Sequence, residues 1–217
     1  MIKGIIFDLD GTLLDTVADI NRELNKALNK FDYDSIDHEE TKKFLGNGSR
    51  TLVKEALKQT VDTKTLDEVS SYYITNYSKP EANILTRPYE GIIDMLNKLQ
   101  QIGIKTAITS NKMDVAVKEL NVKVFNGLFD IALGESEKTP LKPDPTMLYQ
   151  ALELMGLRKE EVLFIGDTEV DLQAATNANL DSVAVTWGFR TKEFLTSLNP
   201  NYIIDEPRQL IEIIKKD

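Results

Sequence analysis

Two aspartates near the start of the chain, Asp8 and Asp10, are the first residues whose types and spacing could carry out chemistry. They follow an apolar run, Ile5, Ile6 and Phe7, which predicts a strand that is buried on both faces and ends at Asp8. Because side chains alternate along a strand, Asp8 and Asp10 should point to the same side. Two carboxylates there favour a divalent cation with oxygen ligands, and Mg²⁺ is the first candidate. A solvated Asp-Gly turn is the plain structural alternative.

Further polar side chains come after the later predicted strands. Ser110 and Asn111 follow the second strand, Lys142 stands before the helix that follows the third, and Asp167 and Asp171 follow the fourth. Taken singly, Ser110 and Asp167 could be helix N-caps. Asp171 could complement a helix dipole, and Lys142 could be a solvated loop lysine. Because ligands of open parallel sheets bind beyond the carboxyl ends of the strands, all of these groups should reach one edge of the sheet. Their joint placement favours a functional site.

The combination of carboxylates, a hydroxyl and a lysine suits phosphoryl transfer. A cation held by Asp8 and Asp167, with the backbone carbonyl of Asp10 as a further ligand, would bridge to a phosphate oxygen. Asp8 could attack phosphorus to form an aspartyl-phosphate, and Asp10 could protonate the leaving oxygen and then activate water. The negative phosphate oxygens could be held by Lys142, Ser110 and the backbone N–H groups around Gly11.

The second half of the chain alternates strands with helices, and this order would bring these groups together. Expected strands cover 5–7, 104–109, 130–133, 162–166, 182–185 and 202–204; expected helices cover 92–99, 112–120, 144–155, 167–175, 191–198 and 207–216. Alternation at this spacing requires parallel strands with right-handed crossovers. We therefore predict an α/β fold with an open, doubly wound parallel sheet.

A block of helices interrupts this alternation after the first strand. A first helix, capped by Asp15 or Thr16, should run to about Asn29. The helical pattern continues without a good strand until Pro80, over segments near 38–45, 49–59 and 65–78. We predict an inserted α-helical domain over residues 16–85, between core segments 1–15 and 86–217.

Four short motifs resemble those of the haloacid dehalogenase superfamily, in its phosphatase branch: Asp8-x-Asp10-Gly11-Thr12, Ser110-Asn111, Lys142-Pro143 and Gly166-Asp167-Thr168-x-x-Asp171. The resemblance spans most of the chain and implies a Rossmann-like core with a small α-helical cap. It implies that Asp8 is the nucleophile, Asp10 the general acid/base, and Ser110 and Lys142 the phosphate binders. It also implies that Asp167 binds Mg²⁺ and that Asp171 supports the metal site. The acid/base aspartate disfavours dehalogenation.

Within the insert, Gly46, Asn47, Gly48 and Arg50 form a stretch that could meet an anion. Two glycines around an asparagine before a helix could present backbone N–H groups, although a plain helix–helix turn is simpler. Arg50 could bind a substrate carboxylate or second phosphate, or could lie on the surface. The other predicted substrate-binding residues are Gly11, Thr12 and Asn111. The Gly-Asn-Gly sequence and residues 186–189 look most similar to bacterial phosphoglycolate phosphatases, which implies 2-phosphoglycolate as the substrate.

Composition narrows the classes of partner. Among 217 residues, 41% are hydrophobic and 28% charged, as in ordinary globular proteins, and a formal charge of −9 argues against nucleic acid. The absence of cysteine excludes disulfides and a cysteine nucleophile, and suits a reducing cytoplasm. No signal peptide or spanning apolar run is evident, so we expect a cytoplasmic protein without a membrane partner. We also expect a monomer or homodimer that acts on a small phosphorylated metabolite. The single histidine, His38, should be an exposed residue at a helix start.

Two other functions stay open from the sequence. A β-phosphoglucomutase-like enzyme would use Asp8 in the same way but return the phosphoryl group to a sugar hydroxyl. A weakly catalytic phosphate-binding or partner-binding module could use the same fold, although it would not need both Asp8 and Asp10. The full set of residues favours a Mg²⁺-dependent phosphatase acting on a small phosphomonoester.

Overall fold

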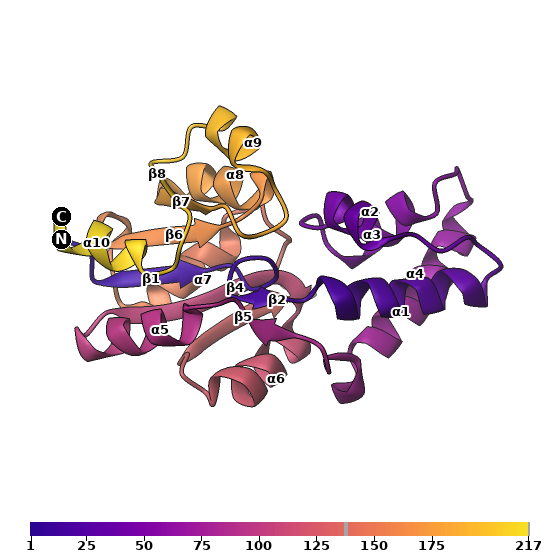
Figure 1. Cartoon of the computed structure of the whole chain (residues 1–217), viewed down its shortest axis with the longest axis horizontal. Helices are drawn as coiled ribbons and strands as arrows, with labels where there is room; N and C mark the ends of the chain where they lie inside the picture. Colours follow the sequence, from indigo (N-terminus) through magenta and orange to yellow (C-terminus); the bar gives the residue numbers. More distant parts are fainter. Residues whose placement is uncertain (137–138, 217) are drawn as a thin grey trace.

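The computed structural model describes residues 1–136 and 139–216, which form a sheet covered by helices and, beside it, a separate group of helices (Figure 1). The strands are β1 (Gly4–Phe7), β2 (Leu14–Asp15), β3 (Arg87–Pro88), β4 (Lys105–Met113), β5 (Ile131–Glu135), β6 (Val162–Gly166), β7 (Asp181–Val185) and β8 (Tyr202–Ile204). The helices are α1 (Val17–Lys30), α2 (His38–Phe44), α3 (Ser49–Ala56), α4 (Thr63–Tyr77), α5 (Ile92–Gln101), α6 (Asp114–Phe125), α7 (Thr146–Met155), α8 (Glu169–Ala178), α9 (Lys192–Ser197) and α10 (Gln209–Lys216). Two short 3₁₀ turns are η1 (Pro80–Ala82) and η2 (Lys159–Glu161).

Six of the described strands form one parallel sheet in the order β5-β4-β1-β6-β7-β8, which confirms the predicted doubly wound α/β fold. β1 lies in the middle, with Phe7 opposite Ile108 of β4 on one side and Ile165 of β6 on the other. The strand order therefore reverses at β1, where the chain crosses from one half of the sheet to the other. The carboxyl ends of these three strands meet at one edge, which is where open sheets of this kind bind ligands.

Alternate residues of β1 enter two different hydrophobic cores. Ile5 and Phe7 pack with α5, α6 and α10 on one face of the sheet, and Ile6 packs with α7 and α8 on the other. All three side chains are buried. A strand that helices cover on both faces has no polar side, which explains its continuous apolar sequence.

Helices α1 to α4, at the right of Figure 1, have a hydrophobic core of their own. Leu24 of α1, Val53 of α3 and Val69 of α4 are fully buried within it. The helices expected in this region are present, and His38 is exposed at the start of α2 as predicted. Asp37 caps α2 by accepting a hydrogen bond from the backbone N–H of Glu40 at 2.8 Å.

A small antiparallel sheet, which the sequence analysis did not predict, lies where the two groups of helices meet. β2 pairs with β3, so the chain enters and leaves the helical group along two adjacent segments. Asp19, buried in the first turn of α1, accepts hydrogen bonds from the backbone N–H groups of Leu85 at 2.8 Å and Thr86 at 2.7 Å. This contact holds α1 against the returning segment.

Strand β4 is longer than predicted. The expected strand ended at Thr109 with a helix from residue 112, whereas β4 continues to Met113 and α6 begins at Asp114. The pairing of β4 with β5 changes register between Thr109 and Met113. Ser110 and Asn111 therefore lie within an irregular part of the strand and not after it. In the described part of the chain, every helix is too short or too polar to cross a membrane.

Candidate active site

A pocket lies between the carboxyl edge of the sheet and the helical group. Asp8 and Asp10, from the loop after β1, border it together with Leu45 and Gly46 from the loop after α2. The prediction that Asp8 and Asp10 lie on the same side is confirmed, because both border this one pocket. Residues from both parts of the chain therefore build the site.

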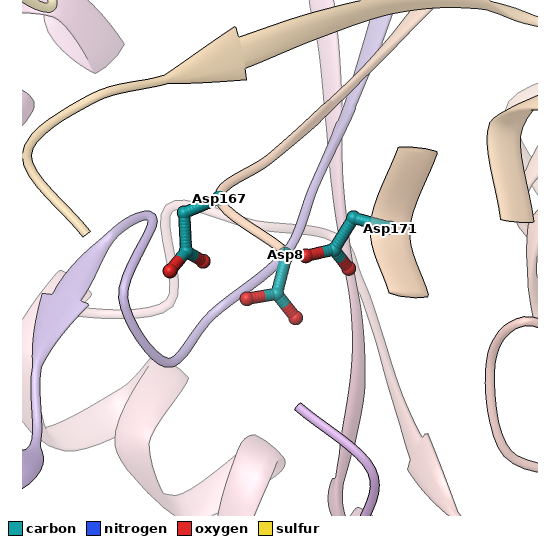
Figure 2. Close-up of side chains that lie close together, drawn as sticks. All are labelled: Asp8, Asp167 and Asp171. Carbon is teal, nitrogen blue, oxygen red and sulfur yellow. The ribbon is translucent and has the colours of Figure 1, made fainter. Parts of the chain in front are cut away.

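Three aspartates, Asp8, Asp167 and Asp171, lie close together at the carboxyl edge of the sheet (Figure 2). One carboxylate oxygen from each of Asp8, Asp167 and Asp171 lies within 4.8 Å of those from the other two, and all three residues are buried. Asp167 directly follows β6, and Asp171 lies in the first turn of α8. Because β1 and β6 are neighbours, Asp8 and Asp167 leave the sheet side by side.

Fixed donors orient two of these carboxylates. Asp167 accepts hydrogen bonds from the Thr12 hydroxyl at 3.0 Å and from the backbone N–H of Phe189 at 2.8 Å. Asp171 accepts from the backbone N–H and the hydroxyl of Thr168, at 3.1 and 2.7 Å. Thr168 is the N-cap residue of α8, so the alternative role of Asp167 as a helix cap does not apply.

Lys142 is the cation within this cluster. Its ammonium donates to Oδ1 of Asp8 at 2.6 Å, to Oδ1 of Asp171 at 2.7 Å and to the backbone carbonyl of Thr109 at 3.1 Å. An ammonium has three N–H donors, and these three acceptors use all of them. Lys142 is thus buried and fixed, and is not a solvated loop lysine.

Burial and mutual repulsion raise the pKa values of the acids. Burial, opposed by Lys142 and assisted by Asp171 and Asp10, raises the pKa of Asp8 to about 7. Burial and then repulsion from Asp171 and Asp8 raise the pKa of Asp167 well above its ordinary value. Burial alone would lower the pKa of Lys142, but the two adjacent carboxylates outweigh it and raise that pKa. One ammonium among three buried carboxylates leaves excess negative charge, so a divalent cation fits both the charge and the oxygen donors.

Asp10 pairs with a lysine that the sequence analysis missed. The ammonium of Lys112, near the end of β4, lies 3.2 Å from Oδ1 and 3.4 Å from Oδ2 of Asp10. It also donates to the hydroxyl of Tyr77 at the end of α4 and lies 4.1 Å from the centroid of that ring. The carboxylate of Asp10 is therefore directed toward Lys112 and is not part of the three-aspartate cluster. Only the backbone carbonyl of Asp10 was expected to bind a metal ion.

Ser110 and Asn111 are both brought to the site but differ in their contacts. Ser110 borders the pocket, and its hydroxyl accepts a hydrogen bond from the backbone N–H of Lys112 at 3.2 Å. The Asn111 amide donates to the carbonyls of Gly46 and Lys142, each at 2.9 Å, and its oxygen accepts from the backbone N–H of Lys142 at 2.7 Å. Asn111 thus ties the loop after α2 to the lysine loop.

Gly11 and Thr12 were predicted among the substrate-binding residues. In the structure they lie against Asp167 and are not among the described residues that border the pocket. Gly11 has a φ of +92°, and a Cβ added there would lie 2.4 Å from Oδ2 of Asp167. Glycine is therefore required both for the backbone conformation and for the close approach of this carboxylate. Thr12 is buried, and its hydroxyl is occupied by Asp167. These two residues position a predicted metal ligand.

The predicted loop of the insert is only partly at the site. Gly46 and Gly48 border the pocket, whereas Asn47 is exposed. Arg50 points away: its guanidinium donates to Oδ1 of Asp67 through Nε at 3.1 Å and Nη2 at 2.8 Å. Its side chain is 53% exposed. The structure thus favours the surface alternative for Arg50.

A different arginine, missed by the sequence analysis, holds this loop to the core. Arg190, after β7, donates to the carbonyl of Lys42 at 3.0 Å and to that of Leu45 at 2.9 Å. Its other donors bind the two carboxylate oxygens of Glu169 at 2.7 and 2.8 Å. No local pattern could have indicated these contacts, because Lys42 of α2 and Leu45 after it are 148 and 145 positions away from Arg190.

Comparisons with known proteins relate the whole chain to one family. The sequence model described as haloacid dehalogenase-like hydrolase matches residues 5–185. Phosphoglycolate phosphatase of Aquifex aeolicus is 30% identical over 213 residues, which cover 98% of this chain and 96% of that protein. Phosphoglycolate phosphatase of Aliivibrio fischeri is 31% identical over 220 residues, with 98% and 96% covered. The crystal structure of a provisionally assigned phosphoglycolate phosphatase from Lactobacillus delbrueckii subsp. bulgaricus superposes with a TM-score of 0.90 at 35% identity, covering 98% of each chain.

Proposed function

The chain belongs to the haloacid dehalogenase-like hydrolases, and we propose that it is a Mg²⁺-dependent phosphatase that cleaves a small phosphomonoester through an aspartyl-phosphate. The observation that carries this proposal is the environment of Asp8. This carboxylate stands at the end of the central strand, is held by Lys142 at 2.6 Å, and has two further carboxylates within 4.8 Å. A nucleophile, a charge-neutralising lysine and a set of oxygen ligands for a hard cation therefore lie together at the end of the central strand.

Asp8 is the nucleophile in this proposal. Lys142 binds Oδ1 and orients the carboxylate, while Oδ2 accepts no hydrogen bond from the described residues. An oxygen of Asp8 attacks phosphorus, the bond between phosphorus and the ester oxygen breaks, and the phosphoryl group is transferred to Asp8. Lys142 and Ser110 lie beside this position and can hold the phosphate oxygens as their charge develops.

Asp10 is the general acid in the first half-reaction and the general base in the second. It donates a proton to the leaving ester oxygen, and then takes a proton from the water that attacks the aspartyl-phosphate. Attack by water releases inorganic phosphate and restores Asp8. Mg²⁺ bound by Asp8, Asp167 and the Asp10 carbonyl, with Asp171 in support, would neutralise charge on the phosphate oxygens.

We propose 2-phosphoglycolate as the substrate. Two relatives that are about 30% identical and match nearly the whole chain are named phosphoglycolate phosphatase, which supports this choice. The pocket holds about 60 Å³, which is room for a few water molecules and therefore favours a small ester.

We further propose that residues 16–85 form a cap domain that closes over the site. Its helices have a separate hydrophobic core, and it joins the remaining segments through the β2–β3 pair. Leu52 and Tyr77 of these helices border the pocket, so closure would exclude water from the reacting groups.

The proposal is tested by phosphate release from a panel of esters in the presence of Mg²⁺, including 2-phosphoglycolate, sugar phosphates and p-nitrophenyl phosphate. We expect turnover that chelation abolishes, and an Asp8→Asn variant that is folded but inactive. Asp34→Asn, at an exposed position outside the pocket, is a matched control and should keep full activity. Wild-type rates in Asp8→Asn would refute the nucleophile, and bisphosphate-dependent isomerisation without phosphate release would indicate a phosphomutase.

A further inference from the structure

Lys112 borders the pocket beside Asp10, and we infer that it selects substrates whose leaving group carries a carboxylate, with Tyr77 as its partner on the cap. This inference rests on the proposed phosphatase function and adds to it the residue that determines substrate preference. Arg50, for which the sequence left open both a substrate carboxylate and a surface position, lies outside the pocket and binds Asp67.

The charge balance of the pocket points to Lys112. Among the described residues that border the pocket, Lys112 and Lys142 are the two with cationic side chains. Lys142 binds Asp8, Asp171 and the carbonyl of Thr109, and in the proposed mechanism its positive charge serves the phosphate. A substrate that carries a carboxylate in addition to its phosphate needs a second cation, and Lys112 is available for it.

The carboxylate contacts of Lys112 are longer than those of Lys142, although both side chains are buried. Lys112 lies 3.2 and 3.4 Å from the two oxygens of Asp10, compared with 2.6 and 2.7 Å for the carboxylate contacts of Lys142. Its side chain is 4% exposed. The ammonium donates to Oδ1 and Oδ2 of Asp10 and to the Tyr77 hydroxyl, and the two contacts with Asp10 are the long ones. A buried ammonium at the edge of a pocket can exchange one of two long contacts with the same carboxylate for a contact with a substrate anion.

The position of Lys112 relative to the reaction also fits a carboxylate. Asp10 is proposed to protonate the ester oxygen, so this oxygen must come next to Asp10, whose Oδ1 is 3.2 Å from the ammonium of Lys112. In 2-phosphoglycolate the carboxylate carbon is two covalent bonds from the ester oxygen. The carboxylate can therefore contact Lys112 while the ester oxygen remains at Asp10.

Tyr77 adds a contribution from the cap. Its ring stacks on Tyr73 at 5.5 Å between centroids and 12° between planes, which fixes its orientation. Its hydroxyl accepts a hydrogen bond from Lys112 and still has its own proton to donate to an anion. Because Lys112 comes from the core and Tyr77 from α4, the carboxylate site is complete when the cap is closed.

The test compares two esters of similar size but different charge: 2-phosphoglycolate and 2-hydroxyethyl phosphate, in which a neutral CH₂OH group replaces the carboxylate. We expect the wild type to prefer 2-phosphoglycolate in kcat/KM. Lys112→Met should lower this preference by about 30-fold, as for the loss of one charge-assisted hydrogen bond. Tyr77→Phe should lower it by about fivefold, as for one neutral hydrogen bond. Lys118→Met, at an exposed lysine of α6, is the matched control and should keep the wild-type preference.

The ratio of kcat/KM for the two esters distinguishes selection of the carboxylate by Lys112 from a role in which Lys112 only orients Asp10. An equal loss with both esters in Lys112→Met would mean that Lys112 only orients Asp10, and an unchanged preference would place the carboxylate elsewhere; either result overturns the inference. If Lys112→Met does not fold, Lys112→Gln removes the charge while keeping a hydrogen-bond donor. A wild type that hydrolyses neither ester would contradict the proposed function instead. The affinity ratio of the two esters, measured by calorimetry with Mg²⁺ in wild type and variant, then tests Lys112 without turnover.

Discussion

Replacing Asp8 by Asn should abolish turnover and, without a metal ion, stabilise the fold. Asp8 is buried, and burial together with the charges of Asp171 and Asp10 raises its pKa to about 7, against the opposing effect of Lys142. Its ionised form therefore opposes folding at pH 8. Asn keeps an oxygen that can accept the hydrogen bond from Lys142 and removes the charge.

The size of this effect follows from the linkage between proton binding and folding. A rise in pKa from 3.8 to about 7 corresponds to about 4 kcal/mol at about 1.4 kcal/mol per unit. The folded-state pKa is raised, so the favourable contribution of the protonated carboxyl is full below pH 3.8 and is lost as the pH rises through 7. Since Asn does not reproduce a protonated carboxyl in every contact, we expect Asp8→Asn to add about 2–4 kcal/mol at pH 8, and about half of that at pH 5. Each kcal/mol should raise Tm by about 2–4 °C for a chain of this size.

Guanidinium unfolding in the presence of a chelator, at pH 5 and pH 8, measures this change. Added Mg²⁺ should make the wild type more stable than Asp8→Asn at pH 8, because the wild type keeps a proposed metal ligand that the variant has lost. The exposed control Asp34→Asn should show neither the stabilisation nor its pH dependence. An Asp8→Asn protein that is less stable than the wild type at pH 8 with chelator would refute the electrostatic reasoning.

Other changes around the pocket have expected outcomes of their own. Gly11→Ala should weaken Mg²⁺ binding by about tenfold or more in a titration, because its Cβ would lie 2.4 Å from Oδ2 of Asp167; unchanged affinity would contradict this role. Mg²⁺ should raise the Tm of the wild type more at pH 8 than at pH 6, since protons compete for Asp8, whose pKa is about 7; equal shifts would exclude that competition. Arg190→Met should raise KM by about three- to tenfold with little change in kcat, because it removes the hydrogen bond that holds the Leu45 carbonyl beside the pocket. An unchanged KM in steady-state kinetics would show that the loop keeps its position without Arg190.

Much of the core could be predicted from the sequence because its signals are local. The apolar run before Asp8 needs cover on both faces, and the alternation of strands and helices requires parallel pairing. Parallel strands deliver their carboxyl ends to one edge, so residues that follow the strands directly, such as Asp8 and Asp167, had to lie near each other. The β2–β3 pair escaped prediction because two residues per strand carry no periodic pattern.

The contacts between the site and helices α1 to α4 join residues far apart in the chain, and no local sequence pattern predicts them. Lys112 and Arg50 are both basic residues near predicted motifs, and the sequence offered Arg50 as one possible anion ligand because it follows a glycine-rich turn. The register change in β4 directs Lys112 to Asp10, whereas the packing of α3 on α4 leaves Arg50 beside Asp67 at the surface.

The sequence by itself determined which chemical groups this protein has at the ends of its strands, since strand order and side-chain alternation follow from short-range patterns. The tertiary structure alone decided which lysine lies beside Asp10, because that depends on how a separate group of helices packs beside the sheet. Lys112 and Tyr77 meet across this interface, although they lie 35 positions apart in the chain. The two residues belong to parts of the chain that have separate hydrophobic cores. Sequence patterns predict the helices and strands of each core but not how the two parts pack against each other.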